Sequence, residues 1–257
     1  MTVNKPRPHT TRMVLDSHMH VGDFPYFNVA IDRDGLVRTM REHAVGTGMV
    51  FHPDNQLVRG IIAETPGLYG LVWVNPRETG AAARAAALLD EPGSRFRGVK
   101  LHPLLDGYHP DDPMVHPVIE VLRERGLPAL IHCGHPIFSL PWSIEELVRR
   151  YPDAHVILGH MGHGNIVYIN ASIDVAARNP RVYLETSGMP MHTKIREAVE
   201  RVGPERVLYG SDAPFHHLTV ELAKVRVSGL PPGTIDAVLG ENGRRLFFGD
   251  GTPDVVM

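Results

Sequence analysis

The chain has 257 residues, of which 43% are hydrophobic and 21% are charged, and its formal net charge is −3. This is an ordinary globular composition, and the length matches the roughly 250 residues of a (β/α)₈ barrel. The nearly balanced charge excludes a basic surface for nucleic acid, and no apolar run approaches the roughly 20 residues of a membrane span. We therefore expect neither a nucleic-acid partner nor a membrane partner.

The cysteine and histidine contents restrict the kinds of metal site. There is a single cysteine, Cys133, beside 16 histidines. One cysteine excludes an intrachain disulfide and any cysteine-built zinc or iron–sulfur site. A reducing, cytoplasmic setting is the simplest expectation, and imidazole is favoured over thiolate as a metal ligand.

Three regions are expected along the chain. Residues 1–12 are polar, contain prolines and lack the apolar core of a secretory signal, so we expect a flexible arm there. Residues 13–249 are expected to form one domain, and residues 250–257 a C-terminal tail. No repeat or long linker divides the central region.

Short aliphatic runs alternate with helix-like segments, a pattern typical of βαβ units and a parallel sheet. The predicted strands are, in chain order, Met13–His18, Thr47–His52, Tyr69–Asn75, Gly98–His102, Pro128–His132, His155–His160, Arg181–Thr186 and Arg206–Ser211. The predicted helices are Leu36–Ala44, Leu57–Glu64, Thr79–Leu89, Met114–Arg125, Ser143–Tyr151, Ile166–Arg178, Lys194–Val202 and Val220–Val227, with short ones at Gly233–Leu239 and Glu241–Phe247. Eight such units predict a single-domain (β/α)₈ barrel. A doubly wound open sheet is the alternative, but no G-x-G-x-x-G motif follows an early strand.

Polar residues stand where the predicted strands end. His18 and His20 follow the first strand as an H-x-H pair. In extended backbone, residues two apart project from the same face, and this spacing suits two ligands of one metal ion. Further strand ends carry His52, Lys100, His102, His132, His160 and Asp212. Because the C-terminal ends of barrel strands surround one pocket, we expect these side chains to converge there.

Several segments resemble the amidohydrolase superfamily of metal-dependent barrels. More narrowly, they are similar to amidohydrolase family 2, which includes the aminocarboxymuconate-semialdehyde decarboxylase-like enzymes. The matching segments are Asp16-Ser-His-Met-His20, Arg97-Gly-Val-Lys-Leu-His-Pro103, Leu130-Ile-His-Cys-Gly134, Ile157-Leu-Gly-His-Met-Gly162, Tyr209-Gly-Ser-Asp-Ala-Pro214 and the closing Leu239-Gly-Glu-Asn-Gly-Arg-Arg-Leu-Phe247. They span almost the whole expected domain in family order.

The resemblance implies a ligand set for a divalent metal: His18, His20, His132 and Asp212. It also implies that His160 either binds a second metal or acts beside the first as an acid–base group. Imidazoles with one carboxylate suit Zn²⁺, which is the expected ion, although Mn²⁺ and Fe²⁺ accept the same ligands. In some relatives a lysine at the position of Lys100 is carboxylated and bridges two metals. A plain ammonium that contacts a substrate carboxylate, or a barrel carboxylate, is the alternative, and we favour one ion.

The loops after the strands carry the expected substrate-binding residues, namely Phe24, His102, Tyr108 and His135. Such loops set specificity in this fold, and their aromatic content favours an apolar or planar small molecule. The same aromatic side chains are also compatible with a cover over the barrel mouth or with a contact in a homo-oligomer.

These features predict a metal-dependent hydrolase that acts on an ester, lactone or amide. Asp212 is expected to take the proton from a metal-activated water, and His160 to stabilise the developing oxyanion. Lys100 is expected to assist in the same pocket. A decarboxylase or hydratase with the same ligands is the alternative, and a barrel with a purely structural metal is the third hypothesis. The sequence does not choose between hydrolase and lyase.

Overall fold

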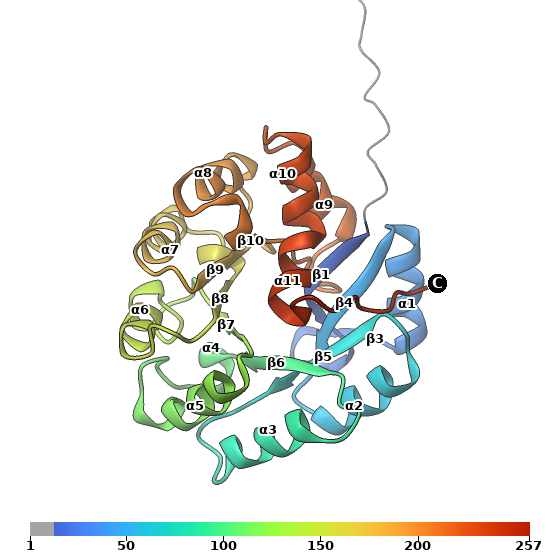
Figure 1. Cartoon of the computed structure of the whole chain (residues 1–257), viewed down its shortest axis with the longest axis vertical. Helices are drawn as coiled ribbons and strands as arrows, with labels where there is room; N and C mark the ends of the chain where they lie inside the picture. The colour runs from blue at the N-terminus through green and yellow to red at the C-terminus, as the bar shows by residue number, and fades with distance from the viewer. Residues whose placement is uncertain (1–12) are drawn as a thin grey trace, which may run out of the picture.

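The computed structural model describes residues 13–257, so the expected arm at residues 1–12 lies outside the described residues. Eight parallel strands follow one another around a barrel in chain order, with helices outside them (Figure 1). The strands are β1 (Val14–His20), β4 (Val45–Phe51), β5 (Leu68–Trp73), β6 (Phe96–Leu101), β7 (Ala129–His132), β8 (Val156–Gly159), β9 (Val182–Glu185) and β10 (Val207–Leu208). The predicted (β/α)₈ barrel is therefore confirmed.

The last strand, β10, is shorter than the predicted Arg206–Ser211, but the chain still joins β1 beyond it. Ser17 N donates to Tyr209 O at 3.0 Å, and Asp212 N donates to His18 O at 2.7 Å. Asp212 has a positive φ of 56°, so the regular strand cannot continue to this residue. These bonds place Asp212 directly beside the H-x-H pair of β1.

Helices fill the connections between strands. They are α1 (Arg33–Glu42), α2 (Asn55–Glu64), α3 (Ala81–Asp90), α4 (Pro103–Asp106), α5 (His116–Arg125), α6 (Pro141–Arg150), α7 (Ile166–Arg178), α8 (His192–Val202), α9 (Leu218–Arg226), α10 (Pro232–Asp236) and α11 (Asn242–Phe248). Helix α1 begins before the predicted Leu36 because the Asp32 carboxylate accepts from Gly35 N at 2.7 Å and caps the helix there. Among these helices, none has both the length and the apolar character needed to cross a membrane.

Two local features differ from the predicted elements. The connection between β1 and α1, for which no strand was predicted, contains a hairpin of β2 (Gly22–Phe24) and β3 (Val29–Ile31). The two predicted closing helices are joined through a π-helical segment, Ala237–Glu241, that runs into α11. This segment packs closely against the residue that precedes β1. A Cβ atom at position 240 would lie only 2.5 Å from the carbonyl oxygen of Met13, so this close approach requires Gly240.

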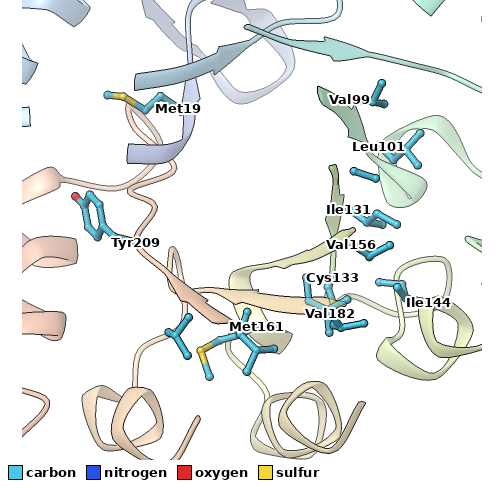
Figure 2. Packing of buried hydrophobic residues seen from close by; sticks show 14 of the residues in the cluster. Met19, Val99, Leu101, Ile131, Cys133, Ile144, Val156, Met161, Val182 and Tyr209 are labelled. Carbon is cyan, nitrogen blue, oxygen red and sulfur yellow. The ribbon is translucent and has the colours of Figure 1, made fainter. Parts of the chain in front are cut away.

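Side chains alternate between two apolar layers along the strands. Val99, Leu101 and Ile131 belong to the large core between strands and helices, and Figure 2 shows Val156 of β8 between Ile131 and Ile144 of α6. A smaller core fills the barrel interior with Leu15, Met49, Phe51, Leu71, Leu130, Ile157 and Leu208, among others. In β6 and β7 the next inward positions toward the C-terminal end are Lys100 and His132. The side chains that face the barrel interior therefore change from apolar to polar as the strands approach the barrel mouth.

The C-terminal tail, residues 250–257, crosses the opposite end of the barrel and is tied to it. The Asp254 carboxylate accepts two hydrogen bonds from Arg95, at 2.7 and 3.0 Å, and one from Gly67 N at 3.0 Å. Val256 N donates to Gly46 O at 2.7 Å, and the Val256 side chain packs on the large core. The tail is thus part of the folded barrel.

This attachment predicts an acid-sensitive contribution to stability. The hydrogen bonds from Arg95 lower the pKa of Asp254 from 3.8 to about 2. Because the folded-state pKa is depressed, the contribution is complete above about pH 4 and is lost as the pH falls toward 2. We expect Asp254→Asn to lower the free energy of unfolding by up to about 1 kcal/mol at neutral pH, since the carboxylate is partly exposed to screening solvent.

Urea unfolding across this pH range measures the effect, with Asp250→Asn as the matched control in the same tail. The difference between Asp254→Asn and the parent should shrink as the pH falls below 4. A difference that grows on acidification would contradict this account of the tail.

Candidate metal centre

The H-x-H pair of β1 meets the aspartate that follows β10. The Nε2 atoms of His20 and His18 lie 2.9 Å and 3.2 Å from the same oxygen, Asp212 Oδ1. All three side chains are buried or nearly so. The two histidines come from alternate positions of one strand, and the hydrogen bond from Asp212 N to His18 O fixes the carboxylate beside them. Residues almost two hundred positions apart in the chain therefore converge on one oxygen atom.

His160 completes this cluster. One ligand atom each from His18, His160 and Asp212 lies within 4.8 Å of the others. His160 stands at the start of a 3₁₀ turn, His160–Gly162, directly after β8. Its Nδ1 is held by Ser187 Oγ at 2.9 Å, which leaves Nε2 directed toward His132 Nδ1 at 3.0 Å.

His132 lies one step farther from Asp212. Besides its contact with His160, its Nε2 is 2.8 Å from His135 Nδ1. Its ring also stacks on His102, with 4.0 Å between ring centroids and 17° between planes. The structure thus places His132 between the cluster and His135: one ring nitrogen faces His160 and the other faces His135.

Glu185, at the end of β9, is a member of the site that the sequence analysis did not identify. Its Oε2 accepts from His18 Nδ1 at 2.8 Å, from His160 N at 3.1 Å and from Ser187 Oγ at 2.9 Å. Its Oε1 accepts from Ser187 N. This carboxylate holds His18 by the nitrogen that faces away from Asp212, and so leaves Nε2 free for the cluster. A carboxylate at the next-to-last position of the predicted strand Arg181–Thr186 was the available signal.

Lys100 is fully buried at the floor of the site. Its Nζ lies 3.4 Å from His18 Nε2 and 4.8 Å from the centre of the Phe51 ring. Burial lowers the pKa of Lys100 from 10.5 to about 8, against the opposing effect of Asp212 and Glu185. An appreciable fraction of the amine is therefore neutral near physiological pH.

The protonation states suit a cation. Burial lowers the pKa of His20 to about 4 and holds the pKa of both His132 and His160 well below 6.5, so these imidazoles are neutral at pH 7. Burial opposes ionisation of Asp212, but His18 and His20 outweigh it and keep its pKa well below 3.8. Burial and Lys100 lower the pKa of His18, whereas Glu185 and Asp212 raise it more strongly. The two carboxylates therefore favour the protonated form of His18 more than the surroundings of the other clustered histidines do.

A cavity of about 250 Å³ opens above the cluster at the barrel mouth. Four expected site residues line it besides the ligand set: Phe24, Lys100, His102 and His135. The cavity walls also include Phe27, Trp73, Leu104, Leu105, His163 and Phe215. Phe215 lies edge-on to His20, at 4.8 Å between ring centroids, and 5.3 Å from Phe24. One wall of the cavity is thus a cluster of phenylalanine rings.

Tyr108 is placed elsewhere. It is only 1% exposed, belongs to the large apolar core, and is absent from the described lining of the cavity. The short helix α4 ends at Gly107, which has a positive φ of 68°, and the chain turns back there, so Tyr108 packs beneath the loop. A substrate contact through Tyr108 does not follow from this geometry.

The residues present fit a divalent cation. His18, His160 and Asp212 each offer one buried ligand atom, and these atoms lie close enough together to bind one ion. The Nε2 atom of His20 contacts the Asp212 carboxylate as well. The Nδ1 atom of His20 is buried and has no hydrogen-bond partner in the described residues, so no hydrogen bond at Nδ1 turns the ring away from the cluster. No thiolate takes part, because Cys133 points into the apolar core.

A family model described as Amidohydrolase matches residues 16–249. The chain belongs to the amidohydrolase family. The match covers every barrel strand except the first two residues of β1, and it includes all of the clustered side chains. As a member of this family the protein is an enzyme, and the proteins similar to it include a lactonase in sequence and decarboxylases in fold.

Three similar proteins illustrate this range. L-fucono-1,5-lactonase of Burkholderia ambifaria is 25% identical over 207 residues, which cover 72% of this chain and 68% of the relative. The solved 5-carboxyvanillate decarboxylase of Sphingomonas paucimobilis has a TM-score of 0.71 at 18% identity and covers 91% of this chain and 98% of its own. The 2,6-dihydroxybenzoate decarboxylase from Rhizobium has a TM-score of 0.72 at 15% identity and covers 93% and 100%. At these identities the two solved structures show the fold alone.

Proposed function

We propose that this amidohydrolase is a metal-dependent hydrolase that opens an ester, amide or, most specifically, a lactone of a small molecule. The observation that carries the proposal is the convergence of His18 and His20 on one carboxylate oxygen of Asp212, at the floor of the cavity at the barrel mouth. The similarity to a lactonase over 72% of the chain supports hydrolysis as the reaction.

We propose that one divalent cation is held by His18, His20, Asp212 and the neighbouring His132 or His160. Neutral imidazoles and a carboxylate suit Zn²⁺, and two solved decarboxylases of this fold carry manganese, so both ions are worth testing. When bound, such a cation lowers the pKa of water toward neutrality and polarises a carbonyl group. Carboxylation of Lys100, whose amine is partly neutral, would be required for a two-metal variant of this site.

The protein groups then divide the proton transfers between them. Asp212 accepts a proton from the attacking water through its carboxylate and later delivers it to the oxygen or nitrogen of the breaking bond. His160 donates from Nδ1 to Ser187, so its Nε2 carries a lone pair that accepts a hydrogen bond from the attacking water. Lys100 lies at the floor, where its ammonium form stabilises the negative charge that develops on the substrate oxygen. Water is consumed, one carbon–oxygen bond forms, and the ester, lactone or amide bond breaks.

Decarboxylation on the same ligands is the second candidate, because two solved structures of this fold are decarboxylases. The described lining of the cavity favours hydrolysis of an uncharged substrate. It contains no arginine, and Lys100 at the floor is its only lysine. A carboxylated aromatic substrate would therefore find no bidentate partner in the cavity walls.

Turnover of L-fucono-1,5-lactone in ¹⁸O-labelled water, followed by mass spectrometry, tests the proposal. Hydrolysis predicts one ¹⁸O atom in the acid product above the uncatalysed background and no CO₂. Assays with 5-carboxyvanillate and 2,6-dihydroxybenzoate form the comparison. Release of CO₂ from either acid, with no opening of any lactone, ester or amide, would assign the site to the lyase reaction.

A further inference from the structure

A second cavity, of about 390 Å³, lies beside the catalytic one. It is bounded by the beginning of α2, one side of α3, the end of β5 and Asp106 at the end of α4. Trp73 lines both cavities, and its indole Nε1 donates to Asp106 Oδ2 at 3.2 Å. The Trp73–Asp106 pair is therefore a wall between the two cavities. A volume of this size is within the range of small-molecule sites.

The carboxylate of Asp106 is a partly buried and only partly satisfied polar group of this second cavity. Its side chain is partly buried, and Trp73 Nε1 is its hydrogen-bond partner within the described chain, which leaves Oδ1 available. Burial raises the pKa of Asp106 from 3.8 to about 6, against the lowering effect of the Trp73 hydrogen bond. Hydroxyl or amide donors from a ligand would replace the hydration that burial removes.

The other two charged side chains of the cavity neutralise each other. Arg84 NH2 donates to Glu78 Oε2 at 2.6 Å, and Arg84 NH1 donates to Thr79 O at 2.6 Å, so its guanidinium is already matched. With that pair cancelled, Asp106 gives the cavity a net negative charge, which disfavours an anionic ligand.

The remaining lining combines an apolar side with amide groups. Ala81, Ala85 and Leu88 of α3 form the apolar side, and the Gln56 side chain makes no hydrogen bond within the described residues. An apolar surface facing a carboxylate and an amide is complementary to a ring that carries hydroxyl groups on its edge and C–H groups on its face.

We propose that this second cavity binds a small neutral polyhydroxylated molecule, such as a sugar ring, whose hydroxyl groups donate to Asp106. The site is separate from the metal cluster, and its occupation does not depend on the hydrolase activity proposed above. Because Trp73 stacks on His102, at 5.4 Å between ring centroids and 16° between planes, a ligand there contacts the residue that also borders the reaction cavity.

Binding of methyl α-L-fucopyranoside, a neutral pyranoside without a lactone bond, tests the proposal. Saturation-transfer NMR and soaked crystals of the full-length protein should place it between Asp106 and α3. Asp106→Asn retains an acceptor for Trp73 but loses the charge, and should weaken binding by about 10- to 100-fold. Ala87→Tyr fills the cavity from α3 and should abolish binding, whereas Ala83→Tyr, one turn away on the same helix and outside the cavity lining, should leave it unchanged.

Thermal unfolding of each variant shows whether the fold is intact. Binding that is equal in the parent, Asp106→Asn and Ala87→Tyr, or density for the pyranoside only above the metal cluster, would overturn the proposal. Stronger binding of ethanolamine or acetate than of the pyranoside would overturn the choice of a neutral ligand. Failure of lactone hydrolysis would leave these binding results unaffected, because they need no turnover.

Discussion

Asp212→Asn is expected to reduce kcat for the best substrate by about 10²- to 10⁴-fold. Asp212 is the residue on which His18 and His20 converge, and it is the only carboxylate in the described lining of the catalytic cavity. The amide cannot accept the proton from water, although it has nearly the same shape and still presents an oxygen to the two histidines. The loss should therefore appear mainly in kcat, with the fold retained.

Metal content measured on the same preparation separates the two roles of Asp212. Asp174→Asn, which removes a surface carboxylate paired with Arg201, provides the matched control and should retain full activity. If Asp212→Asn binds a full complement of metal and still hydrolyses every active substrate at the parent rate, Asp212 is not the base.

Glu185→Gln is expected to weaken metal binding by about 10- to 100-fold, although Glu185 does not face the cavity. Its carboxylate accepts hydrogen bonds from His18 Nδ1, His160 N, and both N and Oγ of Ser187. Glutamine replaces one accepting oxygen with a donor, so at least one buried donor loses its partner. We expect the free energy of unfolding to fall by about 1–3 kcal/mol as well.

Competition with a fluorescent chelator measures the affinity, and urea unfolding of the metal-free protein measures the stability. Glu146→Gln, an exposed carboxylate paired with Arg149 on α6, is the control for loss of a single charge. An affinity within twofold of the control variant's would show that Glu185 does not orient His18 for the metal.

Much of the barrel could be predicted from the sequence because its strands are buried on both faces. Short aliphatic runs, such as those within Val156–Gly159 and Ala129–His132, carry that signal regardless of their partners. The residues that end these runs, including Lys100 and His132, follow from the alternation of side chains along each strand. Their convergence at one mouth then follows from the topology of the barrel.

What the sequence could not provide depends on contacts between distant segments. Glu185 looks like an ordinary polar residue at a strand end until His18, 167 positions away, is seen to donate to it. Tyr108 resembles a loop residue of the mouth, but the turn at Gly107 directs it into the core. Trp73 was predicted only as part of a strand, and its position between two cavities depends on α4, a helix of four residues that was not predicted.

The central claim is that side chains of β1 and of the segment after β10 hold one divalent cation at the barrel mouth. Anomalous diffraction from crystals of the purified protein, collected on both sides of the zinc and manganese absorption edges, tests it most directly. The account predicts one anomalous peak per chain, bonded to His18, His20 and Asp212, with an unmodified Lys100 beside it. A fully active preparation with no anomalous peak at these residues would contradict it.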